Sequence, residues 1–121
     1  MTITNDLACL LRMADSGPKV ACKYLDDPVL YHGRKFDLRF IVLVPSTQPL
    51  RILMHKMFWI RLGNNKFLIT QENLDEYETH FTVMNYSKHH LTQLWFTDFI
   101  REFESQYPHL KWRDIQAAIN R

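Results

Sequence analysis

A strict alternation of charged and apolar side chains constrains the fold of this chain more than any other feature. It runs from Lys35 to Phe40, where Lys35, Asp37 and Arg39 alternate with three apolar residues. Because successive side chains of a β-strand point to opposite faces, this pattern predicts a strand with one charged face and one core face. An apolar run continues the pattern, so we predict one long strand over 35–44.

A turn and a second apolar stretch follow this strand and predict an antiparallel hairpin. The turn is expected at 45–49, where two prolines flank small polar residues, and a strand is expected over 50–55. A further short strand is predicted over 58–62, and another precedes the hairpin over 19–25.

Helical periodicity marks the rest of the sequence. Helices are expected near 7–11, from 73 onwards, over 96–107 and from 112 onwards. Thr4 and Asn5 are candidate caps of the first helix, and Asn73 with Glu76 forms a capping box at the second. Pro108 ends the third. The last reaches the end of the sequence without a stop signal. We therefore expect an α+β fold, an antiparallel β-sheet with flanking helices.

The composition favours a folded domain outside the membrane. The chain has 121 residues, of which 46% are hydrophobic, enough to bury a core. Its longest apolar run, 40–44, is far shorter than the roughly 20 residues of a membrane helix, so no membrane partner is expected. The first residues lack the features of a secretory signal, which indicates the cytoplasm or the nucleus. Cys9 and Cys22 are then expected to be reduced thiols that pack as small buried hydrophobes.

The formal net charge of +2 conceals an uneven distribution of charge. Residues 1–66 carry ten Lys and Arg against five Asp and Glu, whereas residues 67–121 carry five against eight. A basic front half suits phosphates, nucleic acid or an acidic peptide, and an ordinary solvated surface would have the same composition.

Most catalytic and metal-binding motifs are absent. The two cysteines lack metal-ligand spacing, the adjacent His89 and His90 are expected in an exposed loop, and no serine-hydrolase elbow or glycine-rich phosphate loop occurs. What remains is the charged strand face, where Lys35, Asp37 and Arg39 can converge on one ligand. A solvated strand face with alternating charges is the alternative reading of the same residues.

The residues around this strand resemble the central block of the tubulin tyrosine ligase-like family. The resemblance rests on CKYL at 22–25, Pro28, GRKFDLR at 33–39 and VLV at 42–44. It continues through Pro49-Leu50, through Arg61 after an aromatic-rich stretch, and through His80-Phe81-Thr82 after an acidic segment. In all it covers nearly the whole chain.

The resemblance implies a partial ATP-grasp domain. In this family two subdomains clamp ATP, and a carboxylate is activated as an acyl phosphate for attack by an amino group. The product is an amide bond on the tubulin C-terminal tail. Residues 1–121 would be the central part of this domain, truncated at both ends. The Mg²⁺ ligands would lie in a downstream segment, so the chain alone is expected to be inactive.

The resemblance also implies roles for particular residues. Its nucleotide-binding residues would be Cys22, Lys23, Tyr24, Leu25, Lys35, Asp37 and Thr82. The 22–25 segment would meet the adenine through its backbone, while Lys35 would face phosphate and Asp37 the ribose or the reacting end of the nucleotide. Arg39 and Arg61 would hold carboxylates of the tubulin tail or of the incoming amino acid. No catalytic residue and no metal ligand is assigned within the chain.

Two alternatives stay open. Active family members usually carry an asparagine directly after the threonine that corresponds to Thr82, whereas this chain has Val83. A pseudoenzyme scaffold that binds tubulin or ATP without ligation would explain this departure. The other alternative is a basic nucleic-acid binder that stacks bases on Tyr24, Phe40, Phe58 and Trp59. Those aromatic residues are expected mainly in the core, so no nucleic-acid partner is predicted. A tubulin ligase would associate with microtubules in the cytoplasm.

Overall fold

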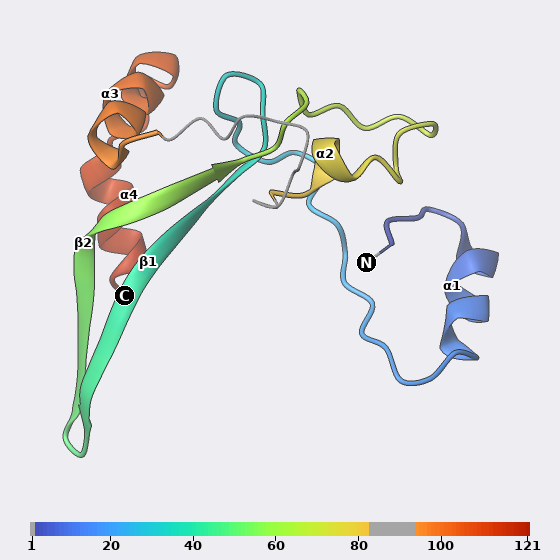
Figure 1. Cartoon of the computed structure of the whole chain (residues 1–121), viewed down its shortest axis with the longest axis horizontal. Helices are drawn as coiled ribbons and strands as arrows, with labels where there is room; N and C mark the ends of the chain where they lie inside the picture. The colour runs from blue at the N-terminus through green and yellow to red at the C-terminus, as the bar shows by residue number, and fades with distance from the viewer. Residues whose placement is uncertain (1, 83–93) are drawn as a thin grey trace.

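The computed structural model describes residues 2–82 and 94–121. The elements are α1 (Leu7–Ala14), β1 (Phe36–Thr47), β2 (Leu50–Leu62), α2 (Tyr77–His80), α3 (Phe96–Gln106) and α4 (Trp112–Ile119) (Figure 1). Within the described ranges the only sheet is the antiparallel pair of β1 and β2. The expected α+β class and the antiparallel hairpin are therefore confirmed.

The hairpin is longer and more continuous than its sequence predicts. β1 extends to Thr47, three residues beyond the predicted strand, and the predicted strands over 50–55 and 58–62 form the single strand β2. Residues 55–57 contain neither glycine nor proline, so nothing in them interrupts the strand. The predicted five-residue turn shortens to Gln48 and Pro49, which are joined by a cis peptide bond.

The core lies between the apolar face of the hairpin and the two C-terminal helices (Figure 1). Its buried hydrophobic residues are Tyr31, Phe58, Phe99, Phe103 and Trp112. Phe36, Leu38 and Phe40, the apolar partners of the alternation, pack against this cluster as predicted. The rings of Phe58 and Trp112 stack with their centroids 5.1 Å apart. This packing explains the apolar stripe of α3, whose predicted extent is confirmed.

Two predicted elements are wrong. No strand forms over 19–25, where the chain has no sheet partner among the described residues and Val20 is 89% exposed. The predicted capping box does not open a helix. The Asn73 side chain accepts from the Thr70 amide and donates to the Leu68 carbonyl, so it closes a turn, and only the single turn α2 follows.

The N-terminal region differs from its prediction in detail. α1 forms where it is expected, but its cap is Asp6, whose carboxylate accepts from the Ala8 amide at 2.9 Å. Cys9 and Cys22 are free thiols, yet neither is buried: Cys9 is half-buried and Cys22 is exposed. In the described ranges, no helix is long and apolar enough to cross a bilayer.

The end of the hairpin near its turn extends away from the helices (Figure 1). The pairing of β1 and β2 shifts register between Phe40 and Val42 and again between Leu43 and Ser46. Beyond the first shift the apolar side chains are exposed on both strands, namely Ile41, Val42, Leu43, Val44, Leu50, Ile52, Leu53 and Met57. The hydrophobic core therefore packs only against the half of the hairpin that contains the start of β1 and the end of β2.

Candidate functional site

The charged face of the hairpin centres on an ion pair between its two strands. Asp37 and Arg61 are directly paired across β1 and β2. The Arg61 Nε donates to both carboxylate oxygens of Asp37, at 2.8 and 3.1 Å, and its terminal nitrogen donates to Oδ2. Both side chains are about a fifth to a third exposed, at 21% and 33%. This fork-shaped contact fixes the orientation of the carboxylate.

Asp37 receives two further contacts. The Thr82 hydroxyl donates to Oδ2 at 2.6 Å, and the Arg39 Nε lies 3.5 Å from Oδ1. Burial raises the pKa of Asp37, but the hydrogen bonds from Arg61 and Thr82 and the charges of Arg61 and Arg39 outweigh burial, so the pKa lies below its ordinary value. Asp37 is therefore held ionised, with its orientation fixed from three directions.

Lys35 lies two residues before Asp37 in the sequence and one residue before β1. Its ammonium donates to the Tyr24 hydroxyl at 2.9 Å and lies 4.3 Å from the centre of the Tyr24 ring. The Tyr24 hydroxyl in turn lies 3.1 Å from Nδ1 of His80, a side chain that is only 1% exposed. The side chain of Tyr24 thus connects the 22–25 segment to Lys35.

The rest of the 22–25 segment is exposed to solvent. Cys22, Lys23 and Leu25 are exposed, and only Tyr24 is half-buried. Within the described part of the chain, the backbone groups of these four residues make no hydrogen bonds. The segment does not form the strand that the family resemblance implies. Its backbone donors and acceptors have no partners among the described residues, so they can pair with the edge of a planar ring of a ligand.

A hollow of about 420 Å³ borders the ion pair, and it is lined by Arg39, Phe40, Trp59 and Arg61. Arg39 and Trp59 face each other across the two strands. The Arg39 side chain is 58% exposed. The hollow therefore offers a guanidinium and an exposed aromatic ring next to the Asp37 carboxylate.

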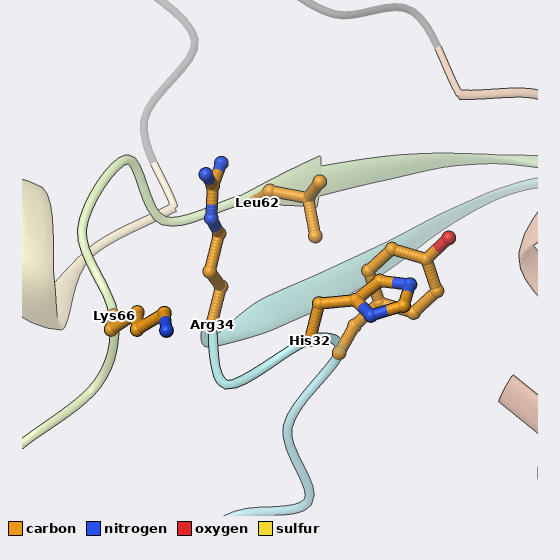
Figure 2. A pocket seen from close by; sticks show the side chains of 5 residues that line it. His32, Arg34, Leu62 and Lys66 are labelled. Atoms are coloured by element: carbon orange, nitrogen blue, oxygen red, sulfur yellow. The ribbon is translucent and has the colours of Figure 1, made fainter. Parts of the chain in front are cut away.

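A second hollow of about 570 Å³ lies at the start of the hairpin, and it is lined by Tyr31, His32, Arg34, Leu62 and Lys66. Figure 2 shows Arg34 standing between Lys66 on one side and Leu62 and His32 on the other. Neither Arg34 nor Lys66 makes an ion pair with any described residue. This hollow was not predicted from the sequence. Arg34 lies in the block that resembles the family, but the resemblance gave it no role.

A tight turn shapes this second hollow. His32 and Gly33 both have positive φ, 49° and 74°, the combination found in a two-residue turn of type I′. His32 tolerates this backbone because Nε2 of its ring lies 3.0 Å from a Glu102 oxygen and its amide donates to Gln106 at 2.7 Å. The adjacent His-Gly pair was the signal in the sequence that could have predicted the turn.

The described residues do not form a magnesium site. Among residues 2–82 and 94–121, no three His, Cys, Asp or Glu side chains gather as metal ligands. Asp37 is engaged by Arg61 and Thr82, and no second carboxylate contacts it in the described ranges. Val83, which departs from the family pattern, and His89 and His90, which are expected in an exposed loop, lie outside the described residues.

Comparison with known proteins supplies the context for this geometry. The model of the tubulin-tyrosine ligase family matches residues 1–121. The chain is 44% identical over 97% of its length to tubulin-tyrosine ligase-like protein 12 of Mus musculus, and 39% identical over 99% to the protein of that name from Caenorhabditis elegans. It is also 28% identical over 91% of its length to a tubulin polyglutamylase of Mus musculus.

These relatives are much longer than the chain. The match covers 19% of the two ligase-like proteins and 14% of the polyglutamylase. The chain thus spans about a fifth of the length of the first relatives that it matches. No solved structure matches the chain.

Proposed function

The chain belongs to the tubulin-tyrosine ligase family, and on that premise we propose that it is the nucleotide-binding centre of an ATP-dependent ligase that acts on the tubulin C-terminal tail. The resemblance seen in its sequence is thereby confirmed at the level of the family. Two contacts near the start of β1 carry the finer proposal, that of the Lys35 ammonium with the Tyr24 hydroxyl and that of the Thr82 hydroxyl with Asp37. Tyr24 thereby links the 22–25 segment to Lys35.

The chemistry of these side chains suits a nucleotide. The Lys35 ammonium can pair with phosphate oxygens. Asp37 can accept from ribose hydroxyls, because its carboxylate is ionised and oriented. The open backbone of 22–25 can pair with the adenine edge, as the family resemblance implies. Thr82 would then contact both Asp37 and the nucleotide.

In the proposed reaction two bonds form in sequence. A carboxylate oxygen attacks the γ-phosphorus of ATP, the bond to the β-phosphate oxygen breaks, and ADP leaves. The nitrogen of an amine then attacks the carbonyl carbon of the acyl phosphate. Inorganic phosphate leaves, and the nitrogen loses a proton. The described residues take part by binding and orienting the reactants.

The two arginines have different parts in this proposal. Arg39 is largely exposed, and its contact with Asp37 is long at 3.5 Å, so it can turn to a carboxylate of the tubulin tail or of the incoming amino acid. Arg61 is held by Asp37 and would contribute its charge from a fixed position. Both remain predicted substrate-binding residues.

The chain would not carry out this reaction alone. We assign residues 1–121 to the central part of an ATP-grasp domain, with the magnesium ligands supplied by other parts of a longer protein. Since phosphoryl transfer depends on the metal for much of its acceleration, the chain by itself should be inactive. The complete protein would work in the cytoplasm, with its tubulin substrate, and a nuclear pool is also compatible with the proposal.

ATP binding to the full-length protein tests this assignment. Lys35→Ala should weaken ATP binding by about tenfold or more, because a charged contact to phosphate is lost. Lys56→Ala is the matched control, since Lys56 is exposed on β2 away from the site. Equal ATP affinities for the two variants would contradict the site assignment.

A non-catalytic scaffold is the second candidate, and one observation favours it. Val83 follows Thr82, where active family members usually carry a polar asparagine. A scaffold would bind tubulin, with or without ATP, and form no amide bond. Incubation of the full-length protein with purified tubulin and labelled tyrosine, glutamate or glycine distinguishes the two candidates, because clear incorporation into tubulin excludes the scaffold.

A further inference from the structure

The segment from His80 to Thr82 matches the spacing of the charged strand face. Lys35 and Asp37 are two residues apart, and so are His80 and Thr82. Between the latter two, Phe81 has extended backbone angles, φ −121° and ψ 144°, so its neighbours point to the same side. Thr82 contacts Asp37 directly, and His80 reaches Lys35 through one intervening hydroxyl. One short segment therefore contacts Asp37 directly and is linked to Lys35 through Tyr24, and both of these groups are proposed to meet the nucleotide.

The two ring nitrogens of His80 have different partners. These partners fix which group donates and which accepts in the hydrogen bonds that run from His80 through Tyr24 to Lys35. Nε2 lies 2.8 Å from the carbonyl oxygen of Asn73, which can only accept, so Nε2 carries the hydrogen. In the neutral ring, Nδ1 then accepts from the Tyr24 hydroxyl at 3.1 Å. The lone pairs of the Tyr24 oxygen are left to face the Lys35 ammonium at 2.9 Å.

His80 is held rigidly in this arrangement. It is 1% exposed and is the last residue of α2. The Asn65 amide donates to the Glu78 carbonyl at 3.1 Å, and a Cβ placed on Gly63 would lie 3.3 Å from the same oxygen. The close approach at Gly63 thus lets the end of β2 pack against α2. A ring fixed in this way can fix the hydroxyl that it accepts from.

We propose that His80 and Tyr24 are positioning residues of the nucleotide site, which hold the Lys35 ammonium in place. A lysine side chain has four rotatable bonds, so fixing it before the ligand arrives lowers the entropic cost of binding. This inference rests on the proposed function, because Lys35 needs to be held only if it meets the nucleotide. It adds a role for two side chains that the family resemblance does not assign.

Three substitutions in the full-length protein test this role through ATP affinity. Tyr24→Phe keeps the ring beside Lys35 and removes only the hydroxyl, and it should weaken ATP binding about fivefold, the effect of one hydrogen bond. His80→Gln can still donate to the Asn73 carbonyl but lacks an acceptor at the position of Nδ1, so the same loss is expected. His80→Asn places an acceptor near that position and should restore most of the affinity.

The inference would be overturned if His80→Gln bound ATP more tightly than His80→Asn. If His80 only anchors α2, His80→Gln should bind ATP normally, and His80→Asn should be the impaired variant. All affinities are measured at a temperature at which circular dichroism shows each variant to be folded. The pattern of rescue therefore separates positioning of Lys35 from support of the fold.

A double-mutant cycle separates this inference from the proposed function. In a Lys35→Met background, Tyr24→Phe should cause no further loss of ATP affinity, because the partner of the hydroxyl is gone. An additional loss of similar size would contradict the inference. If Lys35→Met alone leaves the affinity unchanged, the proposed function fails. If Lys35→Met weakens binding and Tyr24→Phe does not, only the positioning role fails.

Discussion

The two halves of the hairpin are built from the same two strands, yet only one of them is packed. The base half, 36–40 with 58–62, keeps a continuous register and covers the buried rings of α3 and α4. The tip half, 41–47 with 50–57, contains both register shifts and leaves its apolar side chains exposed. Strand pairing alone therefore does not create a core, and a covering layer is needed on at least one face.

The sequence explains why the two halves differ. In the base half, apolar and charged residues alternate over 36–40, so one covered face takes the apolar side chains of this stretch, while Trp59 on the paired strand stays 53% exposed on the charged face. In the tip half, Ile41 to Val44 are all apolar, a pattern typical of strands that are buried on both faces. Within the described residues neither face of the tip is covered. The Asp37 and Arg61 pair of the proposed site lies on the base half, which packs against α3 and α4.

The largest expected difference between the halves comes from truncating one apolar side chain in each. Phe58→Ala removes a ring that is 4% exposed and should lower the free energy of unfolding by about 3 to 5 kcal/mol. Leu53→Ala, on the same strand but 52% exposed, should cost less than about 1 kcal/mol. Urea unfolding followed by circular dichroism measures both, and equal losses would refute the contrast.

An arginine in each half provides a second, smaller contrast. Arg61→Lys removes the forked contact with Asp37 and should cost about 1 to 2 kcal/mol, because the pair is partly exposed to solvent. Arg51→Lys lies in the tip half, where the side chain is exposed, and should change stability by less than about 0.5 kcal/mol. A loss at Arg51 as large as that at Arg61 would show that the tip carries an ion pair of similar strength.

Acidity should affect the base half through Asp37. Its pKa is lower in the folded chain than its ordinary value of 3.8, so its contribution to stability is complete above that value and is lost as the pH falls towards the folded pKa. The tip half contains no Asp or Glu. The melting temperature of Asp37→Asn should therefore fall less steeply than that of the unsubstituted chain below pH 4. Parallel curves would contradict the lowered pKa.

The smallest expected effect on stability belongs to a charge placed at the tip. Leu43→Glu should change the free energy of unfolding by less than about 0.5 kcal/mol, since Leu43 is 59% exposed. The same substitution should reduce self-association of the purified chain, because exposed apolar surface favours contacts between copies. Sedimentation at several concentrations measures this. If the unsubstituted chain sediments as a single monomeric species at all concentrations, the exposed tip does not drive self-association.

The fold was predictable where a periodic pattern coincided with packing. The hairpin and α3 follow directly from the alternation at 35–40 and from the stripe that ends before Pro108. The strand predicted over 19–25 was wrong because a strand also needs an adjacent edge, which no local pattern records. The capping box at Asn73 was wrong because the same side chain can close a turn.

The site was predictable in its residues but not in its connections. Spacing indicated that Lys35 and Asp37 share a face, and the family resemblance added Thr82 and Arg61. Nothing in the sequence showed that Arg61 forms an ion pair with Asp37, or that the buried His80 is linked to Lys35 through Tyr24. Arg61 and Asp37 are 24 positions apart and His80 and Tyr24 are 56 positions apart, so only the tertiary structure brings them together.

The matched two-residue spacing of His80 with Thr82 has an evolutionary consequence. A side chain can be exchanged for another of similar chemistry, but gaining or losing one residue between these positions would turn one of them to the opposite side of the extended chain. Either Lys35 or Asp37 would then lose its support. In homologous genes, insertions and deletions should therefore be excluded from this stretch even where its letters vary.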